Sequence, residues 1–434
     1  MDNGEITSIN HTTQLKTSII KIYLLLALTP LTAQQKLLIP MDAKQTNHLK
    51  AYGIAYWALE KNIEVDWMLN YRGGSFLVNN IPLLANECRI RGVLYEELAD
   101  YTKILSEVNA ENSNTESVRL EKPPKIAVYV PKNFKPWDDA VTLALEYAEI
   151  PYTKIWDDEV LQGKLSEYDW LHLHHEDFTG QYGKFYASQH NTQWYNEQQL
   201  TYERKAKELG FKKVSEEKNA VAQAIKTYVA NGGFMFAMCS ATDSYDIALA
   251  AEGIDICDVM FDGDPPDANA QQKLDFTKTF AFQNFTLETN PFRYEYSDID
   301  NPQSEPVPIR DPSTDYFTLF DFSAKYDPVP TMLIQNHVNI VKGFMGQTTA
   351  FKKNLIKPGI IILGEREESD EVKYLHGNYG RGTFTFYGGH DPEDYQHAVG
   401  DPPTDLNLHK NSPGYRLILN NILFPAAKKK QQKT

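Results

Sequence analysis

The first part of the chain alternates short apolar runs with amphipathic segments. The apolar runs have strand length, and the segments between them repeat apolar residues with a helical period. This pattern predicts strands at 36–40, 65–69 and 92–95 and helices at 44–61 and 82–91. Since alternating strands and helices favour parallel pairing, we expect a small parallel β-α-β-α-β unit over residues 36–106.

A second alternation begins after Pro123-Pro124 and continues almost to the end of the chain. It predicts strands at 125–130, 152–156, 168–174, 234–238 and 383–387 and helices at 138–149, 219–230, 244–251 and 413–424. The polar stretch 107–123 is typical of a linker. Residues 260–335 have weak periodicity and are expected to form an insertion. The predicted fold class is α/β, a mostly parallel sheet flanked by helices over residues 124–425, followed by a basic tail at 426–434.

The N-terminal segment has the layout of an export signal. Lys16 and Lys21 precede a short apolar run at 22–28, and the small residue Ala33 follows Pro30. We therefore predict a signal peptide over 1–33, cleavage near Ala33 and a periplasmic or secreted protein. The run is too short for a membrane anchor, and no later run has eighteen apolar residues, so no membrane association is expected after cleavage.

Composition narrows the classes of partner. The 434 residues carry a formal net charge of −15 and three cysteines. An acidic chain argues against a nucleic-acid partner, and three cysteines do not make a disulfide framework. The expected partner is a small-molecule substrate or ligand. No cofactor and no oligomeric state are indicated.

One cysteine lies in a distinctive context. Cys239 follows the apolar run 234–238 and precedes a helical pattern, so it falls on a sharp strand-to-helix turn. Nucleophile elbows need small residues two positions before and after the nucleophile, here Ala237 and Ala241. The following helix would lower the thiol pKa and, through N–H groups near Ser240, bind an oxyanion. The alternative is a small apolar residue that ends a core strand.

A thiol nucleophile needs a base, and His390 is the best candidate. It follows the late strand and the pair Gly388-Gly389, with Asp391 and Glu393 close behind to orient the imidazole. The alternative is a histidine and two acids in a solvated surface loop.

A polar cluster follows the strand at 168–174. Ligand sites in open α/β sheets form at such strand ends, and alternate histidines share one face, a spacing that suits a transition metal. The same side chains would equally line a substrate pocket, or be histidines satisfied by hydrogen bonds. The residues are His172, His174, His175, Glu176, Asp177 and Tyr182.

The elbow and the late histidine together resemble the class I glutamine amidotransferase-like superfamily. That superfamily has Gly-x-Cys-x-Gly and a later His-Pro-Glu, where this chain has Ala-Met-Cys-Ser-Ala and His-Asp-Pro-Glu. The resemblance implies a flavodoxin-like three-layer domain and a hydrolase or amidase that uses Cys239, His390 and Glu393 or Asp391. The Gly-Gly-His-Asp ending also resembles a trehalose-utilisation-type branch, which implies a non-catalytic binding protein.

The mature chain as a whole resembles an exported bacterial family commonly labelled asparagine synthetase B. The segments DWLHLHHEDFTGQYG and FYGGHDPEDYQHAVGDPPTDLNL carry this resemblance. ATP-dependent asparagine synthesis itself is not supported, since position 2 is Asp2 rather than cysteine and no Ser-Gly-Gly-x-Asp-Ser loop is present. The leading expectation is an exported Cys-dependent hydrolase. The alternatives are a binding protein on the same fold and a metal-dependent enzyme that uses the His172–Asp177 cluster.

Overall fold

The computed structural model describes Met1 and residues 35–131, 139–300, 313, 315–327, 332, 337–344, 346–395 and 401–427. The predicted signal peptide, apart from Met1, and residues 428–434 of the basic tail lie outside these residues. In the described ranges, no helix is both long enough and apolar enough to span a bilayer.

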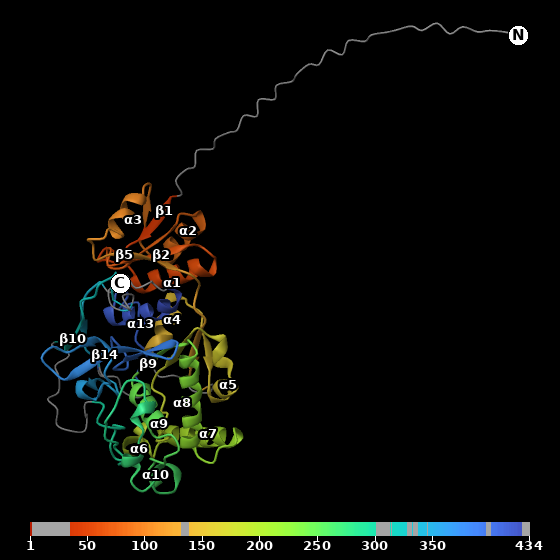
Figure 1. The fold of residues 1–434 in the computed structure, drawn as a ribbon, viewed down its shortest axis with the longest axis vertical. Coiled ribbons are helices and arrows are strands. Elements are labelled where there is room, and N and C mark those ends of the chain that lie inside the picture. The colour runs from red at the N-terminus through yellow and green to blue at the C-terminus, as the bar shows by residue number, and fades with distance from the viewer. Residues whose placement is uncertain are drawn as a thin grey trace. The chain divides into compact units, whose positions relative to one another are not determined.

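The first sheet is antiparallel and has the strand order β4-β1-β3-β2-β5. Figure 1 labels its strands β1, β2 and β5. Its strands are β1 Lys36–Ile39, β2 Val65–Leu69, β3 Ser75–Asn79, β4 Glu96–Leu98 and β5 Glu116–Leu120. The helices that belong to it are α1 His48–Glu60, α2 Pro82–Arg91 and α3 Thr102–Val108. Asn47 is the N-terminal cap of α1, because its side chain accepts a hydrogen bond from the backbone N–H of Lys50 at 3.0 Å.

The predicted parallel β-α-β-α-β unit is therefore wrong. A short turn at 70–74 leads directly from β2 into β3. The sequence pattern did not predict β3 as a strand. A hairpin reverses the chain, whereas a helical crossover would have kept the strands parallel. The structure also differs from the predicted linker at 107–123, since β5 lies within it and pairs with β2.

The second sheet contains both parallel and antiparallel pairs, in the order β11-β10-β13-β14-β15-β9-β8-β6-β7 with β12 beside β14. Its strands are β6 Ile126–Tyr129, β7 Thr153–Ile155, β8 Trp170–Leu173, β9 Phe234–Met238, β10 Tyr316–Leu319, β11 Ile340–Lys342, β12 Phe351–Lys352, β13 Ile361–Glu365, β14 Glu371–Tyr379 and β15 Gly382–Tyr387.

The prediction of a mostly parallel, flavodoxin-like sheet is wrong. The run β7-β6-β8-β9-β15 is parallel, but every pair from β15 through β14, β13 and β10 to β11 is antiparallel. The sheet is therefore mixed. The antiparallel half was missed because its strands alternate apolar and polar residues only weakly.

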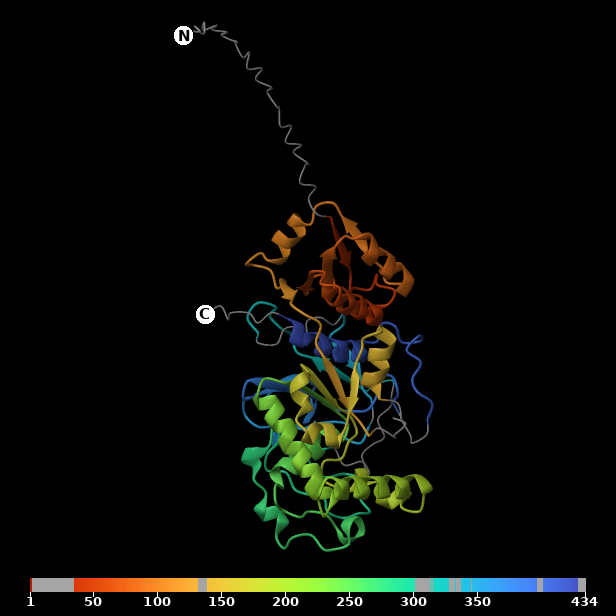
Figure 2. The ribbon, with the colours of Figure 1, turned by 90° about the vertical axis from the view of Figure 1, so that its right-hand side faces the viewer.

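Helices cover both faces of the second sheet (Figure 2). On β9, Phe236 and Met238 join the core that contains α4 Ala140–Ala148 and α13 Pro413–Leu423. Met235 and Ala237 point to the other face, where α5 Asp157–Leu161, α8 Val214–Ala230 and α9 Ala241–Ala250 pack. The remaining described helices are α6 Tyr186–Gln189, α7 Gln193–Glu208, α10 Val259–Asp262 and α11 Ala270–Lys273.

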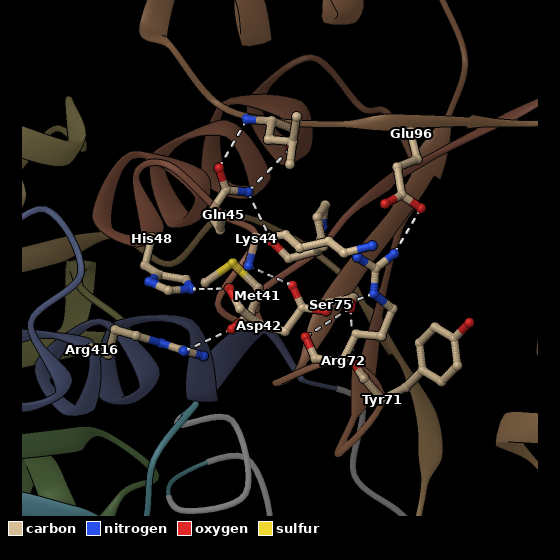
Figure 3. A network of polar contacts seen from close by, with 12 residues as sticks. Met41, Asp42, Lys44, Gln45, His48, Tyr71, Arg72, Ser75, Glu96 and Arg416 are labelled. Carbon is tan, nitrogen blue, oxygen red and sulfur yellow. Dashed lines mark hydrogen bonds and ion pairs between the residues drawn. The ribbon is translucent and has the colours of Figure 1, made fainter.

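The two sheets share one apolar core, because α1 packs directly against α4 and α13. Arg416 of α13 is fully buried at this junction and donates a hydrogen bond to the carbonyl oxygen of Met41 at 3.1 Å (Figure 3). It donates another to the carbonyl oxygen of Gly73 at 2.8 Å. It also contacts His337 Nδ1 at 2.7 Å, and the His337 ring stacks on His48 of α1 with centroids 4.4 Å apart.

The α1–α4 crossing predicts a specific steric effect at Gly53. A Cβ atom at Gly53 would lie 1.8 Å from the carbonyl oxygen of Ala148. We expect Gly53→Ala to lower the free energy of unfolding by about 1–3 kcal/mol, because two backbones must move apart. Chemical denaturation tests this. Helix propensity alone favours alanine by about 1 kcal/mol, so an unchanged or higher stability would contradict the close contact.

Candidate functional site

The C-terminal ends of three parallel strands bring the candidate residues to one edge of the second sheet. β8 leads into His174, β9 into Cys239, and β15 into His390. Two backbone hydrogen bonds join these ends. The N–H of Cys239 donates to the carbonyl oxygen of Gly389 at 3.1 Å, and the N–H of Ala241 donates to that of His174 at 3.0 Å.

Cys239 lies on a strained turn. Its φ of +52° is in the left-handed region, which residues with a Cβ atom rarely adopt. Ala237 and Ala241, two positions away on either side, are fully buried. α9 begins at Ala241, directly after the turn. This is the local geometry of a nucleophile elbow, in which a strained residue is held between a strand and a helix.

The thiol of Cys239 is buried and protonated at rest. Its Sγ atom accepts a hydrogen bond from the backbone N–H of Gln347 at 3.4 Å. Burial raises the thiol pKa to about 11, and the charge of Asp243 adds to the shift, although the N–H groups of Gln347, Ser240 and Thr348 act in the opposite direction. The sequence-based expectation of a lowered pKa at this helix start is therefore not met.

Three histidines converge beside the elbow. The rings of His174 and His390 meet edge to face with centroids 4.5 Å apart, and those of His174 and His175 do so at 4.9 Å. The His175 and His390 rings lie nearly parallel at 5.8 Å. One ring nitrogen from each of the three lies within 4.8 Å of the other two. The elements that carry them are far apart in sequence, so only the parallel sheet brings them together.

The buried carboxylate of Asp139 lies next to this cluster. Asp139 Oδ1 lies 3.3 Å from both His172 Nε2 and His174 Nδ1, and it caps α4 by accepting from the N–H groups of Val141 and Thr142. Burial alone would raise the Asp139 pKa, but the two imidazoles outweigh it and hold the pKa well below its usual range. Burial lowers the pKa of His172 in spite of Asp139.

The acids predicted to orient His390 bond elsewhere. Asp391 is buried and accepts a hydrogen bond from the Tyr415 hydroxyl at 2.7 Å and from the Glu393 N–H at 2.8 Å. Glu393 Oε2 lies 3.1 Å from His409 Nδ1. Asp391 therefore fixes the start of α13, and the structure does not bring either acid into a hydrogen bond with His390.

Three further residues of the predicted pocket, Glu176, Asp177 and Tyr182, follow β8 along the chain. Tyr202 donates to Glu176 at 3.3 Å, and burial raises the pKa of Glu176 to about 7. Asp177 accepts from the N–H of Gly183 at 3.1 Å and so fixes the following loop. The Tyr182 ring stacks on Tyr202 inside the core. These contacts hold the side chains of Glu176, Asp177 and Tyr182 in place in the loop after β8.

Three residues of the site, Asp139, Gln347 and Ser240, have surroundings that the sequence did not predict. Asp139 stands near the start of the helix expected at 138–149, and its contact with two histidines depends on tertiary structure. Gln347 lies in a segment without periodicity and gave no signal. Ser240 was expected to supply an N–H group; its buried hydroxyl has no hydrogen-bond partner among the described residues.

A cleft of about 380 Å³ opens elsewhere on the molecule. It is lined by Lys213, Ser215, Asn219, Asp255 and Asp267, among others, and by none of the predicted site residues. Lys213 is paired there with Asp255. The cleft is therefore separate from the thiol and histidine cluster.

Comparisons with known proteins give only distant likenesses. No protein-family profile and no curated protein matches the chain. Among solved structures, the Salmonella typhimurium cytoplasmic proteins STM3548 and STM1381 match with 10% and 13% identity and a TM-score of 0.34, over 70% of this chain and all of theirs. The GH42 β-galactosidase Gan42B from G. stearothermophilus matches at 12% identity and a TM-score of 0.25, over 62% of this chain and 28% of its own. TM-scores this low support no inference about function.

Proposed function

We propose that the protein is a Cys-dependent hydrolase of the amidase type, with Cys239 as nucleophile and His390 as base. The observation that carries the proposal is the φ of +52° at Cys239. Strain at a non-glycine residue persists only where the surrounding structure enforces it, and it is concentrated at functional sites. Neither Cys88 nor Cys257 has a left-handed backbone.

The proposed reaction follows from the resting state of the thiol. Because Cys239 is protonated at neutral pH, its proton passes to the imidazole of His390 as Sγ attacks the substrate carbonyl. The N–H of Ser240, at the start of α9, stabilises the oxyanion. The imidazolium then protonates the leaving amine, and water hydrolyses the thioester to regenerate the thiol. Asp391 and Glu393 take no part in this scheme.

Alkylation by iodoacetamide tests the nucleophile. We expect Cys239 to react at pH 7 about ten times faster than Cys88 or Cys257, each measured as a single thiol in a variant that lacks the other two. Burial raises the pKa of Cys88 to about 12 and that of Cys257 well above its usual range, so both are matched buried controls.

His390→Gln tests the base. A thiol with a pKa of about 11 is thiolate in only about one molecule in 10⁴ at pH 7, so its reactivity depends on proton removal. The variant is expected to slow Cys239 alkylation and the hydrolysis of p-nitrophenyl acetate by about 10²–10⁴-fold. If Cys239 reacts no faster than Cys88, or if His390→Gln reacts like the wild type, the proposal is wrong.

A further inference from the structure

We propose that His174, His175 and His390 form a zinc site. Imidazole nitrogens suit Zn²⁺, and three of them with an open fourth position, filled by water, are a common zinc ligand set. Nitrogens on one tetrahedral zinc ion lie about 3.4 Å apart. The three here are already within 4.8 Å, so small side-chain rotations complete the site.

His174 supplies independent support for a ligand at this position. Its side chain is only 3% exposed, yet its Nε2 atom has no hydrogen-bond partner among the described residues. A buried nitrogen without a partner is costly unless something binds it. Its Nδ1 atom lies 3.3 Å from Asp139 Oδ1, although out of line for a hydrogen bond. A carboxylate behind a histidine is the arrangement that orients zinc-bound imidazoles.

The backbone around the ligands is fixed. The carbonyl oxygen of His174 is held by the N–H of Ala241 at 3.0 Å. Gly389, next to His390, accepts from Cys239 and donates to the carbonyl oxygen of Thr348 at 2.7 Å. Ligands on such rigid elements need little reorganisation to bind a metal.

Zinc binding also has a consequence that rests on the proposed function. An imidazole nitrogen that holds a metal does not accept a proton. Occupancy of the site therefore removes His390 as the base for Cys239, and zinc inhibits the thiol reaction. The metal site and the hydrolase are separate claims, because binding is measured without any reaction.

Calorimetric zinc titration of chelator-treated full-length protein tests the site. We expect one Zn²⁺ per chain, with Co²⁺ giving the absorption of a four-coordinate site. His175→Gln should weaken binding by at least about 100-fold, and its side chain is partly exposed, so folding should persist. Asp139→Asn should weaken it by about 10–100-fold and retain the helix cap.

His409→Gln is the matched control, since it removes an imidazole from Glu393 outside the cluster and should bind zinc like the wild type. If the wild type takes up no zinc, or if His175→Gln binds it equally well, the zinc site is refuted. If zinc binds with the expected losses in the variants but leaves Cys239 alkylation unchanged, the inhibitory role is refuted. If Cys239 is unreactive in the metal-free protein, the hydrolase fails while the zinc result stands.

Discussion

Asp157→Asn is expected to lower the free energy of unfolding by about 3–5 kcal/mol. Both carboxylate oxygens of Asp157 lie 2.9 Å from Lys218 Nζ, and both side chains are only 1% exposed. The Tyr129 hydroxyl also bonds Asp157. Removing the carboxylate charge leaves the buried Lys218 ammonium with less electrostatic stabilisation. This loss of folding free energy is larger than the net contribution of the ion pair to stability.

The surroundings of Lys218 make the charge hard to neutralise. Burial alone would lower its pKa, but the charges of Asp157, Glu217 and Glu176 outweigh this and raise it. The ammonium also lies 4.8 Å from the centre of the Tyr202 ring. Burial raises the pKa of Glu217 to about 8, so Glu217 is largely neutral at pH 7 and is a poor substitute for Asp157.

Denaturant titrations of two further variants isolate this effect. The double variant Asp157→Asn, Lys218→Met should lose clearly less stability than the sum of the two single changes, because it removes both charges. Asp158→Asn is the neighbouring control. Its carboxylate lies 4.0 Å from Lys205 and is partly exposed, so we expect a loss of about 0–1 kcal/mol. Equal losses for Asp157→Asn and Asp158→Asn would contradict the argument.

The junction between the sheets is expected to weaken in acid. Burial, reinforced by the nearby Arg416 charge, lowers the pKa of His48 to about 4 and that of His337 to about 3. His48 Nε2 contacts the carbonyl oxygen of Asp42 at 2.9 Å (Figure 3). His337 Nδ1 contacts Arg416. Both rings are therefore neutral in the folded protein at pH 7.

The direction of the pH effect follows from these lowered values. An unfolded histidine has a pKa near 6.5, so the unfolded chain takes up protons first as the pH falls. The stability contribution of His48 is complete above about pH 6.5 and is lost as the pH falls through its folded pKa of about 4. The loss approaches at most about 1.4 kcal/mol per pH unit for each ring.

His48→Gln isolates this contribution. The stability advantage of the wild type over His48→Gln should shrink steadily between pH 6.5 and 4, measured by denaturant unfolding at each pH. Buried acids with raised pKa values, such as Asp243 at about 7, titrate in both proteins and cancel in the difference. A constant difference across this range would rule out the effect.

The sequence predicted local elements better than their pairing. The helix expected at 219–230 is part of α8 Val214–Ala230, and the strand expected at 234–238 is β9. Ser412 caps α13 and Pro413 is its first residue, positions at which serine and proline are common. The direction of the strands could not be predicted where β3 follows β2 after a five-residue turn, or where β13 and β14 alternate apolar and polar residues only weakly.

By itself, the sequence determined which residues stand on the strand-to-helix turn. Small residues on both sides of Cys239 are a local requirement of a tight turn, so they are visible along the chain. Only the tertiary structure decided what surrounds the thiol. The raised pKa of the thiol depends on burial. The convergence of His174, His175 and His390 depends on the pairing of β8, β9 and β15. The contacts of His390 with His174 and His175 join residues more than 200 positions apart. Periodicity along the chain carries no information about such contacts.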